Sequence, residues 1–382
     1  MMSEADQRRT GAFLGLAIGD ILGAPLEGFS PSQIQGAIGR VVEVIDPMEV
    51  HREDPSRARL KGLHTDDTQQ AWMIAAVLVE HGQILEEAVA HYYRDFGRPR
   101  SGLPDGVHRG IGPNFRHVVE RLIRKESTRV TGAPSAGNGA AMRVAPIGIH
   151  FSGDLGRVAF NVLQVSGITH TDPRALEAAA ALAGAVSALC CADPPGDPED
   201  VLEAAIEGAA KAEQCLKARH PIQAHVRREK FIGAVRRGLI ELVRQIRTDR
   251  EEWIRQICRI ATSMEPTRPI ENPSVGFAPA SVFLSLAIGA TAESFHEGLI
   301  DAVNQGFDSD TVGAMTGSLL GARFPGSVED SPWIQNLIGV TPLTGMARCL
   351  AGVGEGSPPV PEAFEEDWTR MERELIFERL GT

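Results

Sequence analysis

The stretch PRALEAAAALAGAVSALCC, residues 173–191, decides the fold class of this chain. Asp172 precedes Pro173. This pair is typical of a helix start, because aspartate caps the first turn and proline lacks only a donor that the first turn does not use. The residues that follow are mostly alanine, leucine and valine, with no further proline. We therefore predict a long buried helix over residues 173–191.

The same helical periodicity extends to both sides of this stretch. Alternating β-branched residues bounded by turn residues are scarce, and only residues 41–45 are typical of a short strand. Aromatic residues make up 5% of the chain. The pattern predicts an all-α protein of a dozen or more helices. Beside residues 173–191, we expect helices over residues 8–22, 67–81, 84–96, 115–125, 139–150, 155–167, 198–216, 224–247, 281–291, 295–304 and 310–322.

We expect one domain over the whole chain, residues 1–382. An apolar content of 43% is enough for a substantial core. The segments rich in glycine and proline predict loops, and none is typical of a domain boundary. Residues 211–259 are rich in lysine and arginine and predict amphipathic surface helices, with a role in binding a partner or an anionic ligand as the alternative. Residues 362–380 predict a closing amphipathic helix. The loops are expected at residues 97–113, 193–198, 265–279 and 353–361.

Charge and cysteine content limit the partners. The formal net charge is −12 and the pI is near 5.5, which argues against nucleic acid or anionic lipid as a partner. The five cysteines show no C-x-x-C spacing, so we expect reduced thiols in a cytoplasmic protein. We see no export signal at the N-terminus. Residues 273–292 are uncharged but are interrupted by Pro279, and they predict a buried helix rather than a membrane span.

A first acidic cluster, HTDDT at residues 64–68, lies just before a predicted helix. These residues could simply cap that helix, because aspartate and threonine are favoured there. A cap needs one such residue, however, and this cluster offers four. Carboxylate and hydroxyl oxygens are the ligands that hard divalent cations prefer. Thr65, Asp66 and Asp67 are therefore candidate metal ligands.

A second acidic cluster, GFDSDT at residues 306–311, repeats this arrangement. Asp308, Asp310 and Thr311 again precede an apolar segment rich in small residues. Neither cluster has the spacing of an EF-hand loop. Because the clusters contain no obvious histidine or cysteine ligand, Mg²⁺ or Mn²⁺ is favoured over Zn²⁺. If the clusters converge, they would suit a two-metal hydrolytic site.

Three further segments carry chemical groups. Residues 135–143, SAGNGAAMR, place Gly137 and Gly139 before a predicted helix, where backbone N–H groups could bind a diphosphate. A purely structural glycine turn is the alternative. His170 lies in a turn rich in hydroxyl groups and would either cap a helix or contact a ligand. Asp20 and Glu27 flank a glycine-containing bend. They could be catalytic carboxylates or ordinary surface carboxylates.

Taken together and in this order, five segments resemble the ADP-ribosylglycohydrolase family, which includes the enzyme that reactivates dinitrogenase reductase and the ADP-ribosyl-acceptor hydrolases. The resemblance implies a compact, orthogonal multi-helix bundle of all-α type, with the core motifs over residues 11–322. It also implies two Mg²⁺ ions in a cleft, with Mn²⁺ as an alternative. The segments are GAFLGLAIGDILGAPLEG, HTDDTQQAW, SAGNGAAMRVAPIG, THTDPRALEAA and GFDSDTVGAMTGSLLGA.

The resemblance also assigns roles to residues. Glu27 would be the acidic residue near the scissile bond, with Asp67 and Asp310 as further catalytic carboxylates, and Asp20 would have a supporting role. The expected metal ligands are Thr65, Asp66, Asp67, Asp308, Asp310 and Thr311. The expected substrate contacts are Ser135, Gly137, Asn138, Gly139, Met142, His170 and Phe307.

The implied reaction is hydrolysis of the glycosidic bond between the distal ribose of ADP-ribose and an acceptor. The metals would orient the ribose and activate water, and carboxylates would manage the proton. The partner would be an ADP-ribosylated protein or a small ADP-ribosyl conjugate, and a monomer is favoured. The alternatives are a non-catalytic ADP-ribose-binding or crystallin-like structural relative and a two-metal phosphohydrolase.

Two departures from the family pattern concern the acceptor. Many members have Gly-Gly-Asp where this chain has Gly306, Phe307 and Asp308, so an aromatic ring is expected to reshape the pocket. The arginine-directed bacterial members have Asp-Ile-Gly where this chain has Gly110, Ile111 and Gly112. A carboxylate that would meet a guanidinium is therefore missing, which favours serine-linked, O-acetylated or other ADP-ribosyl conjugates.

Overall fold

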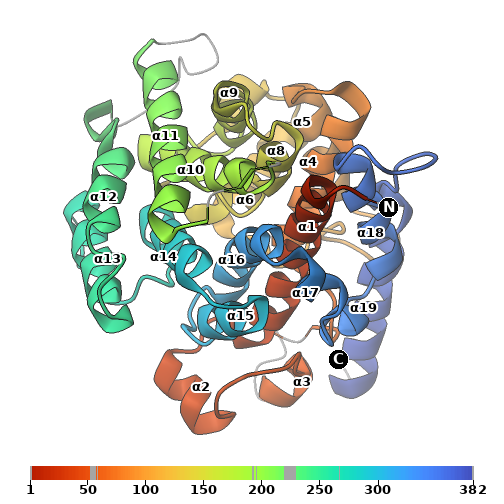
Figure 1. Cartoon of the computed structure of the whole chain (residues 1–382). Coiled ribbons are helices and arrows are strands. Elements are labelled where there is room, and N and C mark those ends of the chain that lie inside the picture. The colour runs from red at the N-terminus through yellow and green to blue at the C-terminus, as the bar shows by residue number, and fades with distance from the viewer. Residues whose placement is uncertain are drawn as a thin grey trace.

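Helices form nearly all the regular structure of the chain (Figure 1). The computed structural model describes residues 2–51, 57, 59–191, 193–194, 196–218, 229–265 and 267–380. Within these ranges there is no β-strand, only three isolated β-bridges. The predicted all-α class is therefore confirmed. The helices are α1 (Glu4–Gly23), α2 (Pro31–Ala37), α3 (Pro47–Val50), α4 (Asp66–His81), α5 (Glu86–Phe96), α6 (Pro113–Ile123), α7 (Thr128–Thr131), α8 (Ala145–His150), α9 (Leu155–Gly167), α10 (Pro173–Leu189), α11 (Pro198–Lys217), α12 (Ala234–Val243), α13 (Arg250–Met264), α14 (Ala278–Thr291), α15 (Phe295–Val303), α16 (Ser309–Arg323), α17 (Pro325–Glu329), α18 (Val340–Leu350) and α19 (Glu365–Leu380).

Helix α10 corresponds to the helix predicted over residues 173–191, and it lies in the core. Alanines cover most of its surface, so that α8, α9, α11 and α14 pack closely around it. The Asp172 side chain caps it by accepting a hydrogen bond from the backbone N–H of Arg174 at 3.0 Å. The same carboxylate pairs with the buried Arg174 guanidinium, with Nη2 and Oδ2 2.7 Å apart. The predicted cap is confirmed.

Helices α1 and α16 are packed along their whole lengths. Glycines recur every four residues on both helices, and these glycines face one another across the contact. A Cβ atom on Gly15 would lie 3.1 Å from the carbonyl carbon of Gly317 and closer still to its oxygen. The backbones can therefore meet only because both residues lack a side chain. This contact fixes the start of α16 beside the end of α1.

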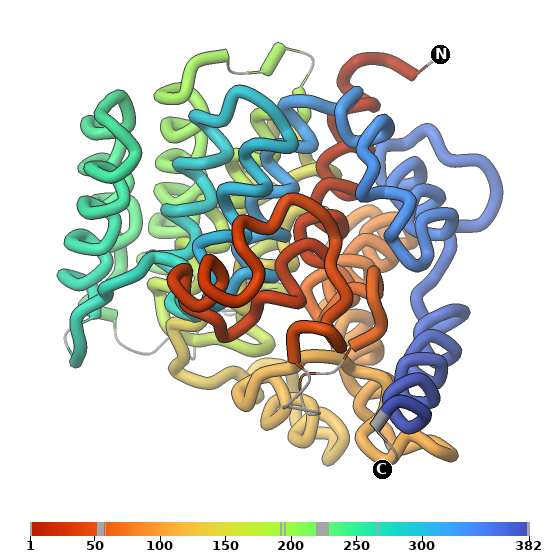
Figure 2. The backbone as a smooth tube through the Cα atoms, turned by 90° about the horizontal axis from the view of Figure 1, so that it is seen from below, coloured from red at the N-terminus to blue at the C-terminus, as the bar shows by residue number. Residues whose placement is uncertain are grey.

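The remaining helices surround this pair. Helices α12 and α13 form one edge of the molecule, and α19 lies on the opposite side (Figure 2). Residues 211–259 were predicted to form amphipathic surface helices, and α12 and α13 each bury one face only. The closing helix predicted over 362–380 is confirmed as α19.

Three local predictions were wrong. Residues 41–45 form no strand, because the side-chain amide of Asn304 bonds both backbone groups of Val41, at 2.9 and 2.8 Å. Residues 139–150 do not form one helix: a short 3-10 turn, Asn138–Ala140, is followed by α8, which starts afresh with Pro146 in its first turn. The helix predicted over 224–247 is shorter, because Gly233 at φ 79° precedes α12. Residues 224–228 lie outside the described ranges.

The length and hydropathy of the helices and the state of the cysteines can be compared with the predictions. In the described part of the chain, no single helix is both long and apolar enough to cross a bilayer. One pair, α1 with α2, meets that test jointly, but it is bent by 75°. All five cysteines are free thiols.

Candidate functional site

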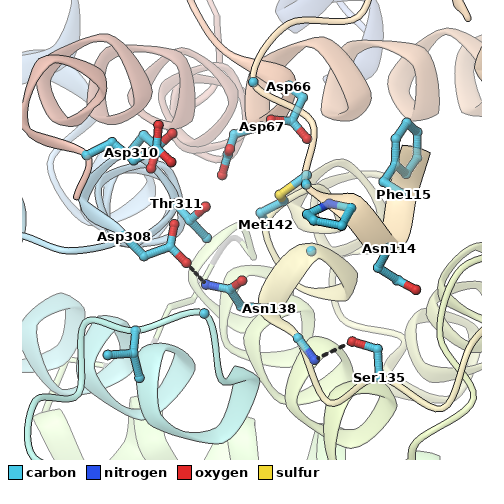
Figure 3. A pocket seen from close by; sticks show the side chains of 18 of the residues that line it. Asp66, Asp67, Asn114, Phe115, Ser135, Asn138, Met142, Asp308, Asp310 and Thr311 are labelled. Carbon is cyan, nitrogen blue, oxygen red and sulfur yellow. Dashed lines mark hydrogen bonds between the residues drawn. The ribbon is translucent and has the colours of Figure 1, made fainter. Parts of the chain in front are cut away.

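Helix starts and loops from distant parts of the chain meet around a cavity of about 490 Å³. Figure 3 shows the acidic residues on one side of it and Asn114, Phe115 and Ser135 on the other. Every residue predicted to be catalytic, to contact the substrate or to bind metal lines this cavity, except Thr65; Asp20, predicted in a supporting role, is not part of the lining. The lining consists of Glu27, Gly28, Asp66, Asp67, Gly110, Gly112, Pro113, Asn114, Phe115, Ser135, Gly137, Asn138, Gly139, Met142, Arg143, His170, Val275, Gly276, Phe307, Asp308, Asp310 and Thr311.

The first acidic cluster forms the start of α4. Thr65 is the N-cap, and its hydroxyl lies 3.2 Å from Oδ2 of Asp67. Asp66 and Asp67 are buried in the first turn. Thr65 therefore supports the turn from behind, whereas the two carboxylates face the cavity.

Asp20 holds this start of α4 from α1. Its buried carboxylate accepts hydrogen bonds from the backbone N–H of Thr65 at 3.0 Å and of Thr68 at 3.0 Å. It also accepts the Thr68 hydroxyl at 2.6 Å. All these donors belong to the first turn of α4, so Asp20 acts as a cap supplied by another helix. Its predicted supporting role agrees with this geometry.

The second acidic cluster forms the start of α16. Asp308 is the N-cap residue, and its carboxylate accepts a hydrogen bond from the side-chain amide of Asn138 at 2.7 Å (Figure 3). Asp310 lies in the first turn of α16 and faces the same cavity as Asp67. The close packing of α1 on α16 therefore brings the two clusters together.

Burial dominates the electrostatics of these carboxyls. Burial, and then the charges of Asp20 and Glu27, raise the pKa of Asp66 to about 8. Burial raises the pKa of Asp67, Asp308 and Asp310 as well, and neighbouring carboxylates add to the rise for Asp67 and Asp310. A divalent cation among these groups would favour their charged forms.

The donor set has the chemistry of a magnesium or manganese site. Oδ1 of Asp67 and Oδ1 of Asp310 are buried and have no hydrogen-bond partner among the described residues. Such oxygens usually bind a hidden partner, because leaving them unpaired is costly. Within the described ranges, no three Asp, Glu, His or Cys side chains are arranged to hold an ion as they stand. Side-chain rotations would have to bring the carboxylates to a shared ion.

The glycine loop forms the opposite wall of the cavity. The Ser135 hydroxyl accepts the backbone N–H of Gly137 at 3.1 Å. A Cβ atom on Gly137 or on Gly139 would lie 3.6 Å from the His170 ring. The loop and the histidine thus form one continuous surface, and the absence of side chains keeps the loop backbone open to the cavity.

His170 is neutral and firmly held. Burial, and then the charge of Arg143, lower the pKa of His170 to about 3. Its Nδ1 lies 2.7 Å from the Thr169 hydroxyl, and its Nε2 lies 3.5 Å from the amide nitrogen of Asn114. An uncharged ring that lines the cavity can exchange hydrogen bonds with a ligand hydroxyl or phosphate oxygen.

A buried hydrogen-bonded chain connects the histidine to the acidic cluster. Arg143 donates to the Thr169 hydroxyl on one side and to the side-chain oxygen of Gln70 on the other. The Gln70 amide then donates to Oδ2 of Asp66 at 2.7 Å. Sequence patterns did not predict this connection, although Gln70 lies four residues after Asp66, a spacing at which helical side chains meet.

Glu27 and Phe307 form the remaining edge. Burial and the charge of Asp308 raise the pKa of Glu27. Phe307 adopts φ 52°, and its backbone exchanges hydrogen bonds with Gly28 N–H and Phe29 C=O, both at 2.6 Å. Phe307 therefore lines the cavity and ties the bend after Glu27 to the second acidic cluster.

Several lining residues could not be inferred from the sequence. Pro113, Asn114 and Phe115 open α6, and Val275 and Gly276 lie in a predicted loop. None belongs to an acidic or glycine-rich motif, so only the folding of α6 and of this loop against the cavity reveals them.

Comparison with known proteins gives a consistent set of relatives. Residues 1–359 match the sequence model of the family described as ADP-ribosylglycohydrolase. The ADP-ribosyl-[dinitrogen reductase] glycohydrolase of Rhodospirillum rubrum is 26% identical over 336 residues, which cover 86% of this chain and 90% of that protein. ADP-ribosylhydrolase ARH3 of Bos taurus is 25% identical over 372 residues, 92% of this chain and 94% of that protein.

A third relative and a solved structure extend this set. The ADP-ribosylarginine hydrolase Tri1 of Serratia proteamaculans is 23% identical over 359 residues, 91% of this chain and 80% of that protein. A solved structure of an ADP-ribosylglycohydrolase-related protein complex superposes with a TM-score of 0.63 at 27% identity, over 92% of this chain and 99% of that one.

Proposed function

Because this chain belongs to the ADP-ribosylglycohydrolase family and is a hydrolase, we propose that it cleaves the glycosidic bond between the distal ribose of ADP-ribose and an acceptor. The substrate is an ADP-ribosylated protein or a small ADP-ribosyl conjugate. The proposed cofactor is a pair of Mg²⁺ ions, which Mn²⁺ can replace. We place this activity in the cytoplasm, where the five free thiols would stay reduced.

One observation carries the metal proposal: three buried carboxylates and one partly buried carboxylate, from two helix starts, face a single cavity, and two of their oxygens lack partners among the described residues. Asp66, Asp67, Asp308 and Asp310 would hold the ions, with Thr311 as a hydroxyl ligand. Thr65 was predicted as a ligand too, and it takes part through its contact with Asp67. When bound, the ions supply Lewis-acid polarisation and orient the ribose hydroxyls.

We assign the proton transfers of the reaction to carboxyl groups beside the ions. Glu27 lines the cavity but belongs to neither acidic cluster, so it is free to assist the leaving group. Asp67 and Asp310 are the candidates for accepting a proton from the attacking water. Glycoside cleavage usually needs both kinds of help.

We assign the opposite wall of the cavity to binding the diphosphate and the sugars of the substrate. Backbone N–H groups of the loop at Ser135–Gly139 would bind the diphosphate, because this loop is open to the cavity and has no side chain at Gly137 or Gly139. His170 and Asn138 would contact the sugars. Met142 and Phe307 supply apolar surface to the same pocket.

We propose an uncharged, oxygen-linked acceptor, such as a serine joined through an O-glycosidic bond or an O-acyl group. Gly110 lies at the cavity edge with φ 71°, a conformation that favours glycine, and a Cβ there would lie 3.1 Å from Oδ1 of Asp66. A carboxylate that would pair with a guanidinium is therefore disfavoured at this position.

The test is a product assay. Purified protein with Mg²⁺ should release free ADP-ribose from serine-linked or O-acetylated ADP-ribose faster than from arginine-linked ADP-ribose, and EDTA should stop the release. Glu27→Gln should lower turnover while metal still binds, whereas Glu43→Gln, at an exposed position, should not. Release of nucleotide or phosphate would instead indicate a phosphohydrolase, and binding of ADP-ribose without turnover would indicate a non-catalytic protein.

A further inference from the structure

The loop between α5 and α6 depends on another part of the chain for its shape. Residues 97–112 contain no helix, and their only β-pairing is an isolated bridge between Arg100 and Leu103. The end of this loop nevertheless carries Gly110 and Gly112, which line the cavity. A loop with so little regular structure needs outside contacts to hold that wall in place.

Those contacts come from the C-terminal helix α19. The Glu365 carboxylate lies 2.7 Å from Nε2 of His64 through Oε1. Its Oε2 lies 2.6 Å from Nη2 of Arg109 and accepts the side-chain amide of Gln69 at 3.0 Å. The side chains of His64, Arg109 and Glu365 are at most 3% exposed. One carboxylate thus joins α19 to both the loop and the start of α4.

The loop and the start of α4 are also bonded directly to each other. Nε of Arg109 donates to the backbone carbonyl of His64 at 3.0 Å, next to the first acidic cluster. The Gln69 amide donates to the carbonyl of Val107 at 2.9 Å. Nη1 of Arg109 donates to the Thr369 hydroxyl of α19 at 3.0 Å. Each of these bonds joins residues that lie within five positions of Asp66 or of Gly110, either to each other or to α19.

Outer contacts repeat the same connection at the surface. Arg370 donates to the carbonyl of Ser101 at 2.7 Å, and Arg373 donates to that of Gly102 at 3.1 Å. Arg100 pairs with Glu366 at 3.3 Å. These partly exposed bonds contribute little stability individually, but they extend the connection with α19 to residues 100–102 of the loop.

The buried network is built from charged and polar groups rather than apolar ones. A buried ion pair is often no more stabilising than well-packed apolar residues, and α19 already has such packing where Phe364 and Trp368 stack near Trp72. What charged groups add is a defined geometry. In addition, α19 lies beyond residues 1–359, the part that matches the family model.

We infer that Glu365 is a positioning residue, which acts through His64 and Arg109 to set the acidic cluster of α4 and the Gly110 edge of the cavity. The inference rests on the proposed function, because it assigns the positioned groups to the metal and acceptor sites. Its first test, however, needs neither metal nor substrate.

That first test is hydrogen exchange of the full-length protein carrying Glu365→Gln, measured by mass spectrometry. We expect amides in residues 97–112 and 64–70 to exchange roughly tenfold faster or more, as when bonds to a charged group are lost locally. Peptides from α10 and α11 should be unchanged. Glu374→Gln removes the same charge from an exposed position of α19 and is the matched control. Unchanged exchange in both segments, or faster exchange throughout the protein, would overturn the inference.

The second test is Mn²⁺ binding, which is measured by titration well below the unfolding temperature. We expect roughly tenfold weaker binding in Glu365→Gln, the lower end of the effect of groups that orient metal ligands. Phe364→Leu weakens the packing of α19 without touching the network, so it serves as the stability control. Equal loss of Mn²⁺ affinity in that variant, at a similar loss of stability, would show that Glu365 only stabilises the fold.

The outcomes separate the two proposals. If the wild-type protein neither binds Mn²⁺ nor releases ADP-ribose, the proposed function fails, while hydrogen exchange still decides whether α19 positions the loop. If Glu365→Gln does not fold, Thr369→Val removes only the hydroxyl that Arg109 bonds. The same amides should then exchange faster, to a smaller degree, and no change would count against the inference.

Discussion

Substitution of Gly23 by alanine should disturb the acidic site from a residue that is not part of it. Gly23 is the last residue of α1, and it faces the start of α16. A Cβ atom there would lie 2.5 Å from the carbonyl carbon of Ser309 and 2.6 Å from the backbone nitrogen of Asp310. An ordinary contact needs 3.4 Å. The carbonyl oxygen of Ser309 would be closer still, so Gly23→Ala requires the two backbones to separate by more than roughly 0.9 Å.

The energetic cost follows from the same geometry. Overpacking a tight contact usually costs about 1–3 kcal/mol, and backbone atoms yield less readily than side chains. The higher helix propensity of alanine offsets at most about 1 kcal/mol of this. We expect a net loss of roughly 1–2 kcal/mol in the free energy of unfolding. The displacement matters more than the stability, because metal–ligand distances tolerate only about 0.2 Å.

Two measurements check this prediction. Urea unfolding should show the modest loss of stability, and Mn²⁺ titration should show at least a tenfold loss of affinity. Gly11→Ala is the matched control, because Gly11 faces Gly321 in the same helix contact but lies twelve residues, about 18 Å, from Gly23. It should lose similar stability and keep its Mn²⁺ affinity. Gly36→Ala, with open space around it, should lose neither.

The pattern across the three variants decides the matter. If Gly23→Ala keeps wild-type Mn²⁺ affinity, or if Gly11→Ala loses as much affinity as Gly23→Ala, the close contact of α1 and α16 does not set the distance between the two acidic clusters.

Three further outcomes are expected. Asp20→Ala removes the acceptor of three buried hydrogen bonds at the start of α4 and should cost about 3 kcal/mol or more in urea unfolding, and Asp20→Asn should cost less. Burial alone would raise the pKa of Glu365, but Arg109 and His64 outweigh it and lower the pKa to about 2. Because this pKa lies below the ordinary 4.5, the contribution of the Glu365 carboxylate to stability is fully present above pH 4.5 and is lost as the pH falls toward 2. In urea titrations, Glu365→Gln should therefore cost up to about 3 kcal/mol above pH 4.5, and this difference from the wild type should vanish toward pH 2. Saturating Mg²⁺ should raise unfolding stability by about 2–3 kcal/mol at a hundredfold excess over Kd, and Asp310→Asn should abolish that rise in a thermal-shift assay.

Sequence patterns predict the helical fold, the family and most of the cavity lining. These features depend on local signals: the alanine-rich run of α10, the cap at Asp172, and threonine and aspartate at the starts of α4 and α16. Each signal acts between residues within about four positions of one another, so it can be read along the chain. The same locality explains the wrong prediction for residues 139–150, where Pro146 starts a new helix.

The residues that support those helix starts from a distance are recognised from the folded arrangement. Asp20 caps α4 from 45 residues away, Arg143 reaches Gln70 across 73 residues, and Glu365 reaches His64 across 301. The family resemblance implied a supporting role for Asp20, but no sequence pattern assigned a role to Arg143 or Glu365. Their roles arise because the glycine-lined contact of α1 with α16, and the docking of α19, bury them beside partners that the chain order keeps far apart.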